Sequence, residues 1–205
     1  MNDIENKKPW DARLAYRLVL PLKNTALTPN HFTWVRLLFG VLACISLGYG
    51  NYVWGNIGAA CFVISNFLDH TDGEFARLTG KMSKFGHYFD LACDAAVNIL
   101  LFLGIGIGLM QSSLGAYSLP MGCLSGFAVA AIFHMRLYIE DSIGKEQARQ
   151  PHLGGMEAED ILYLLPLVTL SDQLVPFLAL ASIGAPLFSI WVFKEYLDIK
   201  KKLSV

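Results

Sequence analysis

Apolar runs long enough to cross a lipid bilayer fill most of this chain of 205 residues. A helix needs roughly 20 mostly apolar residues to span the hydrocarbon core. The hydrophobic content of 54%, with 16% charged residues, agrees, because soluble domains carry more charge. We therefore predict an all-α, polytopic membrane protein formed by one domain, residues 1–205. Its six expected transmembrane helices, of which the fifth is short and contains Pro166, lie at 32–50, 52–69, 87–110, 114–138, 160–170 and 174–196.

The positions of lysine and arginine predict how these spans are oriented. Of the 16 basic residues, all but Arg36 and Arg136 lie in the N-terminal segment, in the connections after the second and fourth spans, or near the C-terminus. The other three connections contain none. Positive residues stay on the cytosolic side, so both termini are expected there, which requires an even number of spans. The net charge of −1 predicts no nucleic-acid partner, and the basic residues instead suit anionic membrane lipids.

The N-terminal segment 9–22, PWDARLAYRLVLPL, has the pattern of a short amphipathic helix. Trp10, Leu14 and Leu18 recur at four-residue spacing, with Arg13 and Arg17 between them. Such a helix typically lies on a membrane surface, with its apolar face in the lipid and its basic residues at the headgroups. The alternative is a helix that packs on a neighbouring subunit.

Four aspartates lie in the segment 69–94, at the expected cytosolic ends of the second and third spans. Asp69 and Asp72 are three residues apart, and Asp90 and Asp94 are four apart, so each pair shares one helix face. Neighbouring antiparallel spans bring the two faces together. Like charges at close range need compensation, and oxygen ligands suit Mg²⁺, Mn²⁺ or Ca²⁺ better than zinc. Acids that merely solvate the membrane boundary are the alternative interpretation.

The residues between these acids favour a phosphate ligand. Gly73 and Gly86 permit close approach to the backbone, Ala76 is small, and Arg77 is able to bridge phosphate oxygens with its two terminal nitrogens. Acids that hold a metal ion, together with an arginine and open backbone, are typical of a pyrophosphate pocket.

The complete spacing resembles the signature of a known enzyme family. All eight specified positions of the CDP-alcohol phosphotransferase signature are present as Asp69-x-x-Asp72-Gly73-x-x-Ala76-Arg77, eight residues, then Gly86-x-x-x-Asp90-x-x-x-Asp94. The segment 28–33, TPNHFT, resembles the family's lead-in to the first span. The resemblance implies transfer of a phosphate-bearing alcohol from a CDP-alcohol to a hydroxyl acceptor, with release of CMP. Members commonly form homodimers, so a second copy of the chain becomes a candidate partner.

The resemblance also implies roles for the motif residues. Asp69, Asp72 and Asp90 would be ligands of two metal ions, Mg²⁺ or Mn²⁺. Asp94 would be the general base that acts on the acceptor hydroxyl, and it would also touch a metal. The residues expected to line the CDP site within the signature are Gly73, Ala76, Arg77 and Gly86. The expected location is the bacterial inner (cytoplasmic) membrane, with the active site facing the cytosol.

Residues outside the signature are further candidates. Asn66 lies one turn before Asp69, and Ser83 three residues before Gly86, so both are predicted in the CDP pocket; a surface turn is the alternative for Ser83. His134, Arg136 and Glu157 are predicted to contact the acceptor or headgroup. For Arg136 the alternative is an ion pair with Glu140, four residues on. For Glu157 the alternative is a favourable interaction with a helix dipole.

The signature specifies the CDP part of the substrate and leaves the alcohol open. The prediction leans to CDP-diacylglycerol as donor and a polar alcohol as acceptor. A soluble CDP-aminoalcohol donor with diacylglycerol or another lipid alcohol as acceptor is the alternative. Two other classes are more remote: a divalent-cation transporter, whose acids would lie mid-span, and a membrane prenyltransferase, whose acidic motifs differ and which has more spans.

Overall fold

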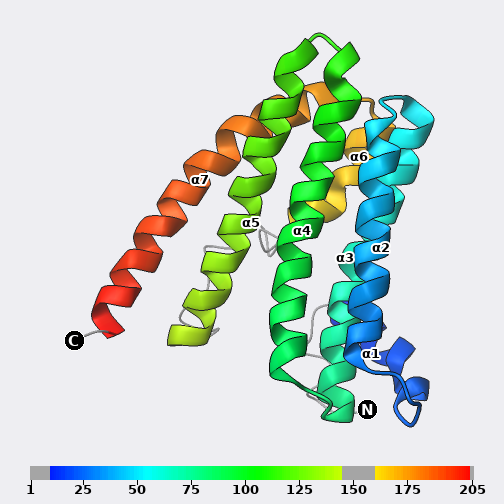
Figure 1. Ribbon diagram of the computed structural model, residues 1–205, viewed down its shortest axis with the longest axis vertical. Helices are drawn as coiled ribbons and strands as arrows, with labels where there is room; N and C mark the ends of the chain where they lie inside the picture. The colour runs from blue at the N-terminus through cyan, green and yellow to red at the C-terminus, as the bar shows by residue number, and fades with distance from the viewer. Residues whose placement is uncertain (1–9, 145–159, 204–205) are drawn as a thin grey trace.

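The computed structural model describes residues 10–144 and 160–203, and these are helical apart from short turns (Figure 1). The prediction of an all-α protein is confirmed for this part of the chain. The α-helices are α1 (Trp10–Val19), α2 (Pro29–Gly48), α3 (Tyr52–Thr79), α4 (Lys84–Gly108), α5 (Ser118–Ile143), α6 (Leu165–Leu170) and α7 (Leu174–Leu203). The 3-10 turns are η2 (Leu20–Leu22), η3 (Leu109–Gln111), η4 (Gly115–Tyr117) and η5 (Asp160–Leu164).

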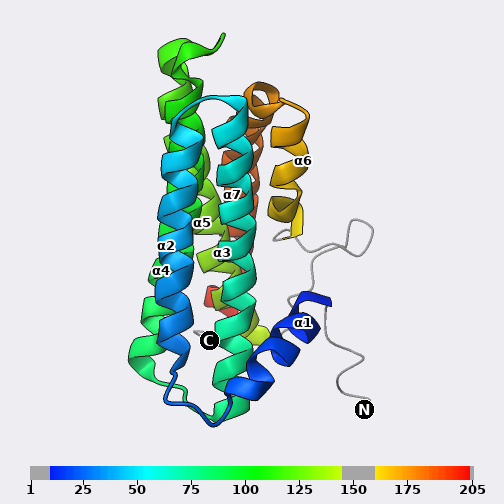
Figure 2. The ribbon, with the colours of Figure 1, turned by 90° about the vertical axis from the view of Figure 1, so that its right-hand side faces the viewer.

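The long helices form an elongated bundle. α2 packs against α3 and α4, α4 against α5, and α5 against α7, so α7 lies on the side of the bundle away from α2 (Figure 1). The short α6 lies beside the upper part of α3, and α1 crosses the lower end of α3 at an angle (Figure 2). The C-terminal ends of α3, α5 and α7 and the N-terminal ends of α2 and α4 all lie at this lower end. The predicted acid cluster therefore lies at one end of the bundle.

Four of these helices are long and apolar enough to cross a membrane: α2, α4, α5 and α7. They correspond to four of the six predicted spans. α3 is long, at 28 residues, but it carries charges over its last turns. The fifth predicted span is formed by η5 and α6, of only five and six residues. The protein is an integral membrane protein, and six spans stay a prediction for these two segments.

Local capping fixes where the site helices begin and end. The side chain of Asn51 accepts a hydrogen bond from Trp54 N at the start of α3, and Gly80 ends the helix with a left-handed φ of 68°. α3 thus continues ten residues beyond the predicted end at residue 69, because no proline interrupts this stretch and Gly73, unlike Gly80, does not adopt a left-handed φ. Ser83 then caps α4 by accepting from Gly86 N over 2.9 Å. Both aspartate pairs consequently lie inside helices and not at their ends.

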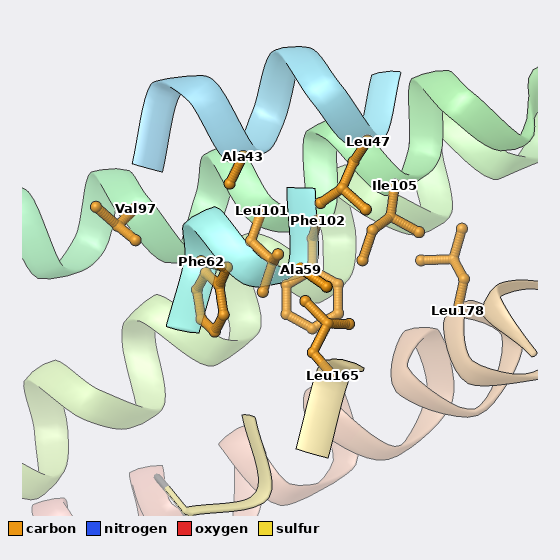
Figure 3. Packing of buried hydrophobic residues seen from close by; sticks show 10 residues of the cluster. All are labelled: Ala43, Leu47, Ala59, Phe62, Val97, Leu101, Phe102, Ile105, Leu165 and Leu178. Carbon is orange, nitrogen blue, oxygen red and sulfur yellow. The ribbon is translucent and has the colours of Figure 1, made fainter. Parts of the chain in front are cut away.

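A cluster of buried apolar side chains joins α2, α3, α4 and α7. The cluster includes Leu47 of α2, Phe62 of α3, Leu101 of α4 and Leu178 of α7 (Figure 3). Small residues let the backbones approach: a Cβ on Gly104 would lie 2.6 Å from the carbonyl oxygen of Cys44. Such close contacts are typical of helix packing in membranes, and they fix α2 and α4 relative to each other.

A helix is present at the predicted N-terminal position. In α1, Ala15 and Val19 are buried and the side chains of Leu14 and Leu18 are exposed. α1 packs on α3 close to the acid cluster's end of the bundle. Its location on a membrane surface stays a prediction.

Candidate active site

The four aspartates come together between α3 and α4, as the helical spacing predicted. One carboxylate oxygen each of Asp69, Asp72 and Asp90 lies within 4.8 Å of the others, a spacing at which the three carboxylates could hold one metal ion. Asp72 is 5% exposed, and its neighbours are partly buried. A set of oxygen ligands alone fits Mg²⁺ or Mn²⁺. Asp94 lies next to this group and contacts the same arginine as Asp69 and Asp90.

That arginine, Arg36 of α2, is the main feature of the site that the sequence interpretation missed. It is 2% exposed. Its Nη1 donates to Asp69 Oδ1 over 2.7 Å and to Asp90 Oδ1 over 3.2 Å, and its Nη2 donates to Asp94 Oδ1. One guanidinium therefore faces an excess of carboxylates. The remaining negative charge favours additional cations, so the residues present fit a divalent-metal centre.

Hydroxyl groups orient this cluster from α2 and α3. Thr33, one turn before Arg36, donates from Oγ1 to Asp72 Oδ2 over 2.7 Å, and this bond is buried. Ser65 of α3 donates to the carbonyl oxygen of Arg36 over 2.9 Å. The sequence does carry a signal for these two residues: Thr33 and Arg36 are polar, lie three residues apart and interrupt an apolar run. Polar residues inside a predicted span usually have a function.

A first pocket opens beside Asp72 and Asp90, between the N-terminal end of α2 and the α3–α4 connection. Four of the predicted CDP-binding residues line it together: Gly73, Ala76, Ser83 and Gly86. Asn30 and Thr33 of α2 line it too, and the sequence interpretation had not included them. A Cβ on Gly73 would meet no atom closer than 4.0 Å, so the pocket reaches the α3 backbone there. Lys81 donates to the carbonyl oxygen of Leu27 over 2.8 Å and so joins this connection to the segment before α2.

The other two predicted CDP-binding residues, Asn66 and Arg77, do not line the first pocket. The side chain of Arg77 is 69% exposed and donates to Glu74 over 2.5 Å, and it is not among the residues that line the first pocket. Asn66 lines a second pocket on the other side of the acids. Ser83 caps α4 and also lines the first pocket, and its contact with a CDP-alcohol stays a prediction.

The second pocket lies between α2, α3, α4 and α5. The polar residues that line it are Arg36, Asn66, Asp69, Asp94, Asn98, His134, Arg136 and Glu140. The predicted acceptor residues His134 and Arg136 thus lie in one pocket with the predicted base. Arg136 Nη2 is 3.1 Å from Glu195 Oε2 of α7, and its guanidinium lies 5.3 Å from the centre of the Trp191 ring. The third predicted acceptor residue, Glu157, lies outside the described residues.

Comparison with known proteins identifies the family. The model of the CDP-alcohol phosphatidyltransferase family matches residues 26–193, which include the four aspartates and every residue that lines the two pockets. The chain belongs to the CDP-alcohol phosphatidyltransferase family. The resemblance that the aspartate signature indicated is therefore confirmed. The transporter and prenyltransferase alternatives find no support in this match.

One curated relative illustrates the family. Archaetidylinositol phosphate synthase of Pyrococcus horikoshii is 34% identical to this chain over 92 residues. The matched part covers 45% of this chain and 47% of the relative, so the chain spans about half the length of that protein.

Proposed function

We propose that this chain transfers a phosphate-bearing alcohol from a CDP-alcohol in the first pocket to a hydroxyl acceptor in the second. The observation that carries the proposal is the shared acid cluster. Asp72 and Asp90 line the first pocket, and Asp69 and Asp94 line the second. Two substrates bound in these pockets would meet at the carboxylates. This arrangement suits direct transfer between them, since positioning supplies a large part of such catalysis.

Asp69, Asp72 and Asp90 would hold Mg²⁺ or Mn²⁺, in the proposed two-ion site together with Asp94. Bound divalent ions supply positive charge that stabilises the transferred phosphoryl group and the leaving CMP. Gly73, which leaves the α3 backbone open, lets a pyrophosphate lie against the helix. Thr33 holds Asp72 in place through its 2.7 Å hydrogen bond.

Asp94 takes the proton from the acceptor hydroxyl. The acceptor oxygen then attacks the phosphorus that carries the alcohol, a new P–O bond forms, and the P–O bond to CMP breaks. CMP leaves with the electron pair. A base acts in this way only within hydrogen-bond reach of the hydroxyl, and Asp94 lines the pocket assigned to the acceptor. Arg36 donates to the Asp94 carboxylate and orients it.

The polarity of the second pocket favours a polar acceptor and CDP-diacylglycerol as the donor. A lipid alcohol would not need the charged residues of α3, α4 and α5 that line this pocket. The relative is named for a product with an inositol phosphate headgroup, which agrees with a polar acceptor. The alternative is a soluble CDP-aminoalcohol donor with diacylglycerol or another lipid alcohol as acceptor.

We also propose that the acid cluster faces the cytosol at a bacterial inner membrane. The exposed basic residues Lys81 and Lys84 are at this end of the bundle, and so are Lys200–Lys202 at the end of α7. Positive residues favour the cytosolic side. α1 would lie on the membrane surface with the exposed Leu14 and Leu18 toward the lipid.

The test is release of CMP by the purified protein in lipid or detergent. CDP-diacylglycerol is supplied with polar acceptors, and CDP-choline or CDP-ethanolamine with diacylglycerol, each with Mg²⁺, with Mn²⁺ and with EDTA. Lipid products are identified by mass spectrometry. Metal-dependent CMP release with CDP-diacylglycerol and a polar acceptor supports the proposal. CMP release only with diacylglycerol as acceptor would show that the acceptor, and not the donor, carries the lipid. No CMP release from any donor and acceptor pair would reject the proposed function.

A further inference from the structure

Asn98 of α4 has a buried polar atom in the second pocket that no described residue satisfies. The residue is 6% exposed and lies one turn after Asp94. Its Nδ2 donates to the backbone carbonyl oxygen of Asp94 over 2.9 Å. A carbonyl only accepts, so the amide nitrogen is fixed on it and Oδ1 is the remaining polar atom of a side chain that lines the pocket. Among the described residues, Oδ1 has no hydrogen-bond partner.

An asparagine elsewhere in the bundle shows what is specific to Asn98. Asn56 of α3 makes the same local bond, from Nδ2 to the carbonyl oxygen of Tyr52 over 2.8 Å, and its buried Oδ1 also has no partner among the described residues. Its pocket is otherwise lined by apolar side chains of α3 and α6. Asn98 shares its pocket with charged residues and with the proposed base. The free oxygen of Asn98 is therefore available to a polar ligand.

We propose that Asn98 Oδ1 accepts a hydrogen bond from a second hydroxyl of the acceptor, which makes the acceptor a polyol. This inference rests on the proposed function, in which Asp94 takes the proton of the reacting hydroxyl. Residues four apart share a helix face and lie about 6 Å apart along the axis. A single hydroxyl has one proton, which Asp94 takes, so it cannot also donate to Asn98 Oδ1. An acceptor with a second hydroxyl, on a carbon next to the reacting one, supplies the missing donor on the same helix face.

The same geometry predicts discrimination between acceptors. A polyol satisfies Oδ1 when it binds, whereas an acceptor with one hydroxyl leaves a buried oxygen unpaired. Sites built to bond a hydroxyl reject analogues that lack it for this reason. Asn98 is thus a specificity-determining residue, and its neighbour on the same face, Asp94, acts on the reacting hydroxyl. Single-hydroxyl acceptors such as serine are then poor substrates.

The experiment compares matched acceptors and matched variants. CMP release from CDP-diacylglycerol is measured with glycerol 3-phosphate and inositol 1-phosphate. Each is paired with the analogue that lacks one hydroxyl next to the reacting one, such as 3-hydroxypropyl phosphate. Serine is included as a single-hydroxyl acceptor. The proteins are the wild type, Asn98→Leu, Asn98→Asp, which retains an oxygen acceptor, and Asn56→Leu, which removes an equivalent amide outside the site.

We expect the wild type to prefer a polyol to its deoxy analogue by at least roughly tenfold in kcat/KM, the equivalent of one hydrogen bond. Asn98→Leu brings this ratio close to one with the donor KM unchanged, Asn98→Asp keeps part of the preference, and Asn56→Leu keeps all of it. An active wild type that does not distinguish the analogues overturns the inference alone. So does an unchanged ratio in Asn98→Leu. A wild type that releases no CMP from any donor and acceptor overturns the proposed function as well.

Discussion

Arg36 Nη1 lies 2.7 Å from Asp69 Oδ1, across the interface between α2 and α3. The same guanidinium reaches Asp90 and Asp94 on α4, so one side chain connects three helices at their acid-bearing ends. Arg36 is almost completely buried. A buried charge is tolerated only when it is paired, and here the arginine and the carboxylates require each other. The acid cluster is therefore held together by the protein's own cation as well as by any metal ion.

Replacement of Arg36 tests whether its guanidinium is the counter-ion of the acid cluster. Arg36→Met keeps the length of the side chain and removes its charge, so the carboxylates lose their internal counter-ion. Breaking a buried ion pair in this way costs about 3–5 kcal/mol. We expect thermal unfolding of the variant in detergent to shift to lower temperature, and the shift to be larger in EDTA than in MgCl₂, since the metal supplies part of the missing charge.

Arg17→Met is the matched control, because Arg17 is exposed on α1. It should leave the unfolding temperature nearly unchanged in both buffers, since exposed charges contribute little to stability. An Arg36→Met protein that unfolds like the wild type in EDTA would show that the guanidinium is not a counter-ion of the cluster.

Thr33 gives a second prediction, on metal affinity. Thr33→Val keeps the shape of the side chain but removes the hydrogen bond to Asp72. Partners that orient a metal ligand typically contribute 10–100-fold to affinity, so we expect Mn²⁺ binding, followed by electron paramagnetic resonance, to weaken by about that factor. Thr71→Val is the control: this buried threonine bonds only the backbone of its own helix among the described contacts. Equal Mn²⁺ affinity in the two variants would contradict the orienting role.

The sequence was sufficient to predict which carboxylates share a face, because three- and four-residue spacings depend only on helix geometry. It could not indicate that α2 docks onto both acid-bearing helices. The contacts of Thr33 and Arg36 depend on that docking. The docking is fixed by close backbone contacts far from the acids, such as Gly104 against Cys44. A charged residue inside an apolar span, such as Arg36, is nevertheless a functional signal that the sequence alone displays.

Which pocket a residue lines depends on the helix face it occupies more than on its distance along the sequence from the signature. Asn66 is three residues from Asp69, and this spacing carries both to the second pocket, although the nearby signature suggested the nucleotide site. Arg77 is part of the signature, yet its side chain is directed to Glu74 and to solvent. Glu74 itself is buried, and its contacts could not be predicted from a motif in which its position is unspecified.

Asp94 yields a prediction that separates catalysis from binding. Asp94→Asn keeps the size of the side chain and removes the base, so CMP release should fall by about 10²–10⁴-fold, the usual contribution of a general base. Binding of the CDP-alcohol should remain detectable by equilibrium dialysis, because the first pocket is lined by Asp72 and Asp90 instead. Asp72→Ala is the contrasting variant, in which metal-dependent donor binding is lost. Full turnover in Asp94→Asn would reject its role as the base.

Replacing Gly73 should raise the stability of the protein and weaken its binding of the donor. Alanine at this position of α3 meets no atom closer than 4.0 Å, and alanine in place of glycine inside a helix typically stabilises it by about 0.5–1 kcal/mol. The added methyl nevertheless extends toward the first pocket, where a pyrophosphate would approach the backbone. We expect Gly73→Ala to unfold at a temperature equal to or above that of the wild type and to bind CDP-diacylglycerol more weakly in equilibrium dialysis. Gly184→Ala in α7, equally open, should leave donor affinity unchanged, and unchanged affinity in Gly73→Ala would show that the nucleotide does not lie against this helix.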